Sequence, residues 1–286
     1  MQKLSIIIED NLKPLKFDIM LPYPNIDPTI IEIGPFKLRW YGLMYALGFI
    51  AAYMLISIQQ KARRIGLQRE ILQNLIFYLA LGLVIGARLG YVLFYQFTHL
   101  ADYISRPLEI IAVWHGGMSF HGGLIGAVFS AVIFCRYHHM PFWDVADTVI
   151  VTAPIGLTLG RLGNFINGEL YGRPTDVPWA MLFPGAGQMP RHPSQLYEAF
   201  LEGVLLFIVL WKLKDMGFRP GAMVSCFLGF YGAFRFLAEF FRQPDAHLGL
   251  LFGLLSMGQI LCLFMVAAAP ILWWLLPRGA IDSASG

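Results

Sequence analysis

Charged residues are scarce in this chain of 286 residues. Only 14% of them are Asp, Glu, Lys or Arg, whereas 57% are apolar and 15% are aromatic. Soluble domains average about 25% charged and about 45–50% apolar residues, so the polar surface here is too small to coat a soluble globule. The formal net charge of +3 is also too small to indicate a nucleic acid partner. Lipid is therefore the expected solvent.

Cysteine is rare as well, and no cysteine pair has the close spacing of a zinc or redox site. Cys135, Cys226 and Cys262 lie in or beside apolar stretches, which is typical of small core residues. His115 and His121 would not share a helix face, which is poor geometry for a zinc pair. We expect neither a metal nor a cofactor.

The leading segment has no long apolar run. Charged side chains such as Lys3 and Glu9 interrupt residues 1–20, so we expect no cleavable signal peptide. Residues 1–37 predict an external arm with some extended structure, because Ser5–Ile8 is a short β-branched run and Pro22, Pro24, Pro28 and Pro35 forbid a continuous helix.

Long apolar windows with few charges follow, each near the roughly 20 residues that a helix needs to cross a bilayer. The sequence therefore predicts an all-α polytopic membrane protein with about seven spans. The windows are residues 38–58, 73–97, 119–136, 144–163, 195–212, 221–239 and 250–276.

Basic residues divide the connections into two sets. One set carries Lys61, Arg63, Arg64 and Arg69, then Arg136, then Lys212, Lys214 and Arg219, then Arg278. The positive-inside rule places this set, with a tail at residues 277–286, in the cytoplasm. Residues 98–118, 164–194 and 240–249 then lie outside, and residues 164–194 predict a small periplasmic head. Basic residues on the leading segment, such as Lys13 and Lys37, argue against the external N-terminus that seven spans require.

Several ionisable side chains fall within or at the ends of the windows. Inserting one such side chain into the hydrocarbon core costs about 2.5–3.5 kcal/mol, so each is expected to have a structural or functional role. They are Arg88, His121, Asp144, Asp147, Arg161, Glu198, Glu202, Arg235, Glu239 and Arg242. Under the proposed topology six of them fall near the outer ends of the spans, where they could converge on one cavity. They are His121, Arg161, Glu198, Arg235, Glu239 and Arg242. Two or three arginines there would bind a phosphate, and snorkelling or interhelical ion pairing is the alternative.

Polar residues are densest in GRLGNFINGELYG at residues 160–172. Arg161, Asn164, Asn167 and Glu169 lie there between four glycines. An arginine and amides suit the phosphate and ester oxygens of a lipid, although an amide-rich helix cap is a simpler interpretation. Tyr41 and Tyr231 are open to two interpretations, as interfacial anchors or as groups that face the substrate.

Two classes of function remain open on these residues alone. Intramembrane charges mark transport pathways as readily as catalytic sites. A transporter or lipid-binding protein with an outer-leaflet anionic site often carries a two-part internal repeat with broken helices, and we find no repeat in the sequence.

The same segments resemble the bacterial prolipoprotein diacylglyceryl transferases. GRLGNFINGELYG is similar to that family's signature without a gap from Gly160 to Gly172. The resemblance extends to WYGLMYALGF at 40–49, GGMSFHGGLIG at 116–126, RHPSQLYE at 191–198 and YGAFRFLAEFFRQPD at 231–245, and so covers about residues 23–276. It favours the enzyme over the transporter.

The resemblance implies that residues 38–276 form a catalytic domain in the bacterial inner membrane, with its site toward the periplasm. The implied reaction transfers the diacylglyceryl group of phosphatidylglycerol to the lipobox cysteine of a prolipoprotein and releases glycerol phosphate. The implied functional residues are Tyr41, His121, Arg161, Asn164, Gly172, Tyr231, Arg235, Glu239 and Arg242.

Roles for these residues follow as hypotheses. Arg161 and Arg235 would hold the phosphate, and His121 would take the thiol proton, since an imidazole has an unperturbed pKa of about 6.5. Glu239 would act directly or orient an arginine. The nucleophile belongs to the substrate, so no enzyme cysteine is required. Self-contained spans indicate a working monomer, and His115 is expected to be peripheral.

Overall fold

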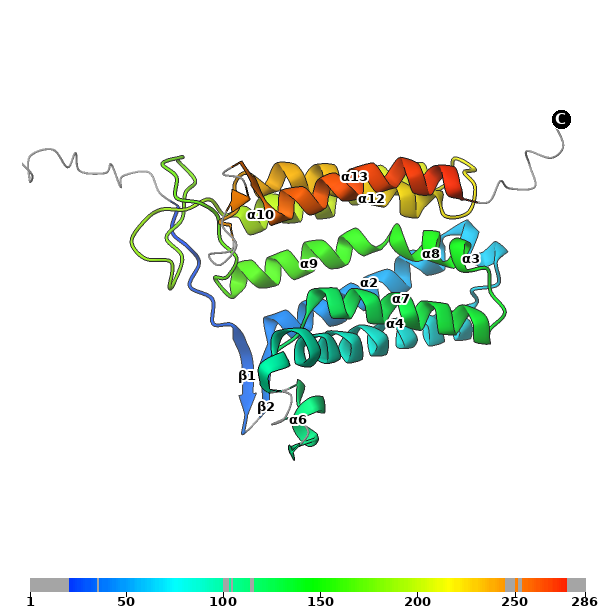
Figure 1. Cartoon of the computed structure of the whole chain (residues 1–286), viewed down its shortest axis with the longest axis horizontal. Helices are drawn as coiled ribbons and strands as arrows, with labels where there is room; N and C mark the ends of the chain where they lie inside the picture. The colour runs from blue at the N-terminus through cyan, green and yellow to red at the C-terminus, as the bar shows by residue number, and fades with distance from the viewer. Residues whose placement is uncertain are drawn as a thin grey trace, which may run out of the picture.

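A computed structural model describes residues 21–34, 36–99, 103, 105–113, 116–244, 250–251 and 254–276. The expectations for residues 1–20, His115 and the tail at 277–286 lie outside these residues. The helices run roughly parallel to one long axis (Figure 1).

Two short strands open the described chain. β1 (Thr29–Ile33) and β2 (Phe36–Arg39) form an antiparallel hairpin in which Ile33 pairs with Phe36. Further back, the Tyr23 hydroxyl donates to the carbonyls of Phe165 (2.6 Å) and Ile166 (3.1 Å). Extended structure was expected in this arm, and the arm is fixed to the end of a later helix.

The rest of the described chain is mainly helical. Its first half contains α2 (Trp40–Ile58), α3 (Gln60–Arg64), α4 (Arg69–Gly90) with a π-helical continuation η1 (Tyr91–Tyr95), η2 (Phe97–His99), α6 (Leu108–Ile111), α7 (Phe120–Tyr137), α8 (Phe142–Ile150) and α9 (Ala153–Ile166). Its second half contains α10 (Ser194–Glu198), the π-helix η4 (Ala199–Leu205), α11 (Leu206–Leu213), α12 (Ala222–Glu239), the hairpin β3 (Leu250–Leu251) and β4 (Leu255–Ser256), and α13 (Met257–Leu275).

Within the described residues, five helices are long and apolar enough to cross a membrane: Trp40–Ile58, Arg69–Tyr95, Phe120–Tyr137, Ala222–Glu239 and Met257–Leu275. The pair α8 and α9, bent by 42°, makes a sixth candidate. The polytopic helical architecture is confirmed. Helix also fills the remaining window, at Ser194–Leu213, but this segment carries Glu198, Glu202 and Lys212. Seven spans therefore stay a prediction.

Two boundaries differ from the expected ones. The window at 144–163 is not one straight helix, because the helix breaks after Ile150 and resumes at Ala153 with Pro154 in its first turn. α13 begins at Met257, not at 250. There the Ser256 hydroxyl accepts from the Gln259 N–H, and the Gln259 side chain accepts from the Ser256 N–H. This capping box fixes the start of the helix.

Glycines bring α4 and α7 into close contact. A Cβ atom added to Gly86 would lie 2.7 Å from the Gly126 Cα, and one added to Gly90 would lie 2.7 Å from the Gly122 Cα. Small residues of this kind let helix backbones approach within a membrane. The α4–α7 pair is therefore a tightly packed unit.

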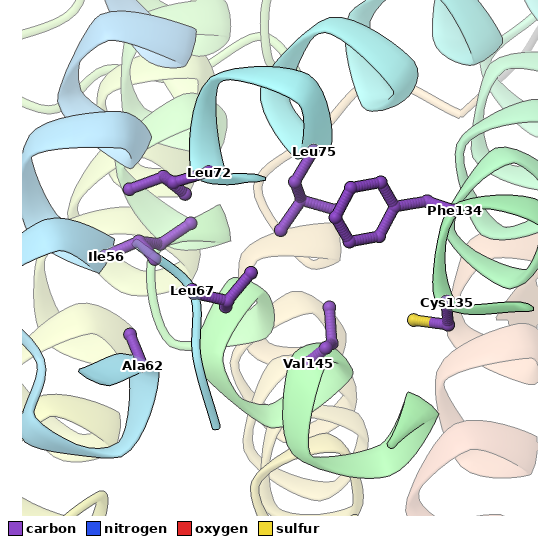
Figure 2. Packing of buried hydrophobic residues seen from close by; sticks show 8 residues of the cluster. All are labelled: Ile56, Ala62, Leu67, Leu72, Leu75, Phe134, Cys135 and Val145. Atoms are coloured by element: carbon purple, nitrogen blue, oxygen red, sulfur yellow. The ribbon is translucent and has the colours of Figure 1, made fainter. Parts of the chain in front are cut away.

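An apolar cluster closes the end of the bundle that carries the basic connections. Figure 2 shows Leu75 of α4 next to Phe134 of α7, Leu72 of α4 beside Ile56 of α2, and Val145 of α8 below. Cys135 belongs to this cluster, Cys262 is buried, and Cys226 packs half-buried against a second cluster. The interpretation of the cysteines as core residues is confirmed for Cys135 and Cys262 and in part for Cys226.

Candidate active site

Three helical segments bring acidic and basic side chains together at the end of the bundle near the 167–193 loop. Arg161 lies on α9, Glu198 ends α10, and Arg235 lies on α12. α10 packs against both α9 and α12, and Figure 1 shows α10 at the end of the bundle where the loops lie. Residues far apart in the sequence thus meet in one cluster.

Glu198 is the centre of this cluster. Its Oε2 atom lies 2.9 Å from Arg161 Nη2 and 2.5 Å from Arg235 Nη1. Its Oε1 atom lies 3.4 Å from Arg242 Nη1, just beyond the end of α12. Three guanidinium groups therefore converge on one carboxylate.

Two further carboxylates complete the cluster. Glu202 lies 3.3 Å from Arg161 and 3.1 Å from Arg235. Glu239 pairs with Arg235 at 2.8 Å and accepts from the Ser256 hydroxyl at 3.0 Å. The i,i+4 pairing of Arg235 with Glu239, the alternative to phosphate binding, is thus one part of a larger network.

Burial makes this network unusual. Glu198 and Glu202 are fully buried, while the arginine side chains keep 13–18% of their surface. Buried charges are stable only when paired, and here the three positive and three negative charges cancel. Most of the remaining exposure belongs to the cations, because the Glu239 side chain keeps only 6% of its surface.

Unused donors remain on all three arginines. Among the described residues, no hydrogen-bond or ion-pair partner is present for Nε and Nη1 of Arg161, Nε of Arg235, or Nε and Nη2 of Arg242. A guanidinium group carries five N–H donors in a fixed fork that matches phosphate oxygens. These N–H groups are therefore free to donate to a further acceptor.

The amides of the 160–172 segment form a second polar group. Asn164 is buried and donates to Glu169 Oε1 at 2.8 Å, and Asn167 donates to the same oxygen at 3.2 Å. Gln195 donates to the Glu169 carbonyl at 2.7 Å. The cap-like interpretation of these amides is correct in part, since they hold the loop after α9 against α10.

Gly172 lies where the loop crosses the chain after α12. A Cβ atom there would lie 2.5 Å from the Phe241 carbonyl and 2.6 Å from His192, so only glycine fits. Arg173 donates to the Arg242 carbonyl at 2.9 Å. Burial lowers the pKa of His192, which packs between Tyr197 and Phe241. Because Gly172 has no side chain, the loop can pass close to Phe241 and help to position Arg242.

The two tyrosines singled out in the sequence lie beside the arginines. Tyr231 is one turn before Arg235, stacks on Phe227, and is within electrostatic range of Glu202 and Arg161. Tyr41 lies against Gly163, and its hydroxyl is 3.3 Å from that of Tyr45. Arg161 also acts electrostatically on Tyr45, which the sequence analysis did not single out.

His121 stands apart from this network. It is exposed at the start of α7, where its ring contacts Phe120, and within the described chain it pairs with none of Glu198, Glu202 and Glu239. The structure thus joins five of the six groups expected to converge and does not bring His121 into contact with them.

Three other ionisable groups have structural roles. Arg88 is buried and donates to the carbonyls of Glu109, Ile110, Gly116 and Gly117. At the opposite end, Asp147 pairs with Lys61 at 2.9 Å and accepts from the N–H groups of Gly221, Met223 and Val224, while Asp144 also pairs with Lys61. In the part of the chain that the structure describes, no group of three His, Cys, Asp or Glu side chains could hold a metal ion.

The sequence profile of the family described as prolipoprotein diacylglyceryl transferase matches residues 28–275. This match spans the bundle and the arginine cluster. The chain belongs to this family.

Relatives with a common name share about half of the residues. A phosphatidylglycerol–prolipoprotein diacylglyceryl transferase of Geobacter sulfurreducens is 52% identical over 241 residues, covering 84% of this chain and 92% of the relative. One of Coxiella burnetii is 53% identical over 258 residues, covering 89% and 97%. One of Legionella pneumophila is 49% identical over 256 residues, covering 89% and 99%.

Glu202 is the member of the cluster that sequence reasoning missed. It was recognised as an ionisable residue within a span but was not placed with the arginines. A signal was present, because Glu202 follows Glu198 by four residues and so lies on the same helix face.

Proposed function

We propose that this chain transfers the diacylglyceryl group of phosphatidylglycerol to the lipobox cysteine thiol of prolipoproteins. The products are a thioether and sn-glycerol 1-phosphate, and the reaction is the first step of bacterial lipoprotein maturation. Three relatives about half identical to this chain carry the name of this activity. The observation that carries the proposal is the convergence of Arg161 and Arg235 on one oxygen of Glu198, at 2.9 and 2.5 Å.

The reaction needs a site for a departing phosphate. The thiolate sulfur forms a bond to the glycerol carbon of the lipid, and the bond from that carbon to the phosphate oxygen breaks with its electron pair on oxygen. Positive groups fixed beside the leaving oxygen stabilise this charge without reorganising during the reaction. In the proposal Arg161 and Arg235 supply this charge, and Tyr41, Asn164, Gly172, Tyr231, Glu239 and Arg242 shape the lipid site.

The thiol proton needs an acceptor, because an ordinary cysteine has a pKa of about 8.5 and only the thiolate is nucleophilic. We propose His121 as this base. Its exposure at the start of α7 leaves it open to an incoming peptide. The competing proposal is that the arginines alone lower the thiol pKa of the bound substrate.

The pH profile of His121→Gln separates these two proposals. Loss of His121 as the base should lower the transfer rate at least about tenfold, in line with general-base contributions. The loss should shrink at high pH, where the thiol ionises unaided. A variant with nearly full activity at every pH would make His121 structural.

We also propose the orientation of the molecule in the bacterial inner membrane. In this proposal the chain has seven spans, and Ser194–Leu213 is the span whose acidic groups pair with arginines. The 167–193 loop and the site would then lie toward the periplasm. The basic connections then lie in the cytoplasm, in keeping with the positive-inside rule. One chain contains all the groups in the proposed site, so a monomer suffices.

Purified protein in detergent, incubated with phosphatidylglycerol and a lipobox peptide, tests the activity. Mass spectrometry should detect a diacylglyceryl adduct on the peptide cysteine and an equal amount of glycerol phosphate. A folded preparation that retains lipid but forms no adduct would instead favour a transporter or lipid-binding protein.

A further inference from the structure

Polar groups on α9 and α10 form two layers. Arg161 and Glu198 form one layer, joined at 2.9 Å. Asn164 follows Arg161 by three residues, and Gln195 precedes Glu198 by three residues, so each amide shares a helix face with its charged neighbour. α9 runs toward the 167–193 loop and α10 runs away from it. Both amides therefore lie about one helical turn closer to the loop than the ion pairs, about 4.5 Å along the axis.

This second layer holds one carboxylate in place. Glu169 Oε1 accepts from Asn164 and Asn167, and its backbone carbonyl accepts from Gln195. Asn164 and Gln195 are buried, whereas Glu169 is exposed, and among the described residues its Oε2 atom has no partner. Glu169 thus combines a fixed position with an open acceptor atom.

Further acceptors in this layer also lack donors. Gln195 Oε1 and Asn167 Oδ1 are buried and have no hydrogen-bond partner within the described residues. Buried polar atoms without a partner are rare, because leaving them unpaired is costly. The layer is therefore rich in acceptors and short of donors.

The two layers favour different parts of one ligand. The arginines attract a phosphate, whereas the Glu169 carboxylate repels it and attracts hydrogen-bond donors. A phosphate ester with hydroxyl groups on the two carbons beyond its ester carbon matches this order and spacing. Phosphatidylglycerol, the lipid in the proposed function, carries such a headgroup.

We propose that Glu169 accepts a hydrogen bond from a headgroup hydroxyl and makes the site specific for a hydroxylated phospholipid. Asn164, Asn167 and Gln195 are its positioning residues. The proposal rests on the proposed function, because it takes the arginine cluster as the phosphate site. In this proposal the headgroup glycerol, which leaves with the phosphate, lies on the side of the arginine cluster that faces the 167–193 loop.

Two lipids test this assignment. Phosphatidylglycerol and phosphatidylpropanol have the same charge, and only the first has headgroup hydroxyls. The value of kcat/KM for transfer to a lipobox peptide is measured with each lipid. It is measured on the wild type, on Glu169→Ala, on Glu169→Gln, which keeps the side-chain shape, and on Asp176→Asn, which neutralises an exposed carboxylate of the same loop.

The wild type and Asp176→Asn should prefer phosphatidylglycerol at least about tenfold, since a hydrogen bond to a charged acceptor is worth one to two decades. Glu169→Ala should reduce this ratio to near one through a loss with phosphatidylglycerol alone, and Glu169→Gln should give an intermediate ratio. A wild-type ratio near one, or an equal loss with both lipids in both Glu169 variants, would overturn the proposal.

A binding measurement keeps this test separate from the activity. If the wild type forms no adduct with either lipid, the proposed function fails. Native mass spectrometry of the full chain with both lipids in competition then decides the specificity. Retention of phosphatidylglycerol over phosphatidylpropanol by the wild type, lost in Glu169→Ala, would support the role of Glu169, and equal retention would contradict it.

Discussion

Glu202 is a fully buried carboxylate, and its role in the bundle is to pair with two arginines. It lies 3.3 Å from Arg161 and 3.1 Å from Arg235, two cations that repel each other. Removing one member of a buried ion pair leaves its partner uncompensated, which costs several kcal/mol. Glu202 therefore allows two arginines to lie close together in a buried site.

We predict that Glu202→Gln destabilises the protein by about 3 kcal/mol or more, because two buried guanidinium groups then share one fewer negative charge. Thermal unfolding in detergent measures the change. Glu32→Gln is the matched control, since Glu32 pairs with Lys37 at 2.8 Å on the surface with both side chains about half exposed, and exposed pairs contribute about 0–1 kcal/mol. Equal unfolding midpoints for the two variants would contradict the role of Glu202.

Individual residues of the cluster were partly predictable. Arg161, Glu198, Arg235, Glu239 and Arg242 stand out in the sequence because charge in an apolar span is costly. The same reasoning could not separate them from Arg88 or Asp147, which are equally costly but bind backbone groups. Partner identity depends on which helices pack together, and a one-dimensional pattern does not contain that information.

The positions of the helices could be predicted from the sequence more accurately than their ends. Hydropathy located all seven helical windows because the apolar runs are long. The break between α8 and α9 and the late start of α13 depend on local hydrogen bonds, such as those of Thr152 and Ser256. Hydropathy averages over about 19 residues and does not resolve such contacts.

The close contact between α4 and α7 predicts the effect of a larger side chain at Gly86. Gly86→Leu should destabilise the bundle by several kcal/mol and lower activity, because even its Cβ would lie 2.7 Å from the Gly126 Cα. Gly156→Ala is the control, since no atom lies within 4 Å of a Cβ there. Thermal unfolding of both proteins checks the difference, and a stable Gly86→Leu would show that the two helices can separate.

The whole molecule has polar groups concentrated at its two ends, with different roles. One end carries Lys61, paired with Asp144 and Asp147, beside the apolar cluster of Figure 2. The other end carries the arginine cluster and the 167–193 loop. The distribution of basic residues along the sequence predicts which end faces the cytoplasm. The hydropathy of a helix alone does not indicate its orientation in the membrane.

We predict opposite exposure of the two ends in cells. In a chain with Cys135, Cys226 and Cys262 replaced by Ala, which should remain active, a cysteine is placed at Asp176 or at Arg64. A membrane-impermeant maleimide should label Asp176→Cys in spheroplasts, and Arg64→Cys only after the membrane is permeabilised. Labelling of Arg64→Cys alone in intact spheroplasts would reverse the proposed orientation.

We propose that the arginine cluster holds the lipid phosphate during transfer, and the rates of adduct formation by Arg161→Gln and Arg235→Gln measure this role. Loss of a charge-stabilising group should slow transfer about 100-fold or more in each variant. Arg64→Gln, which removes an exposed cation at the opposite end, should keep the wild-type rate. Folded Arg161→Gln and Arg235→Gln proteins with rates near that of the wild type would show that these arginines do not hold the phosphate.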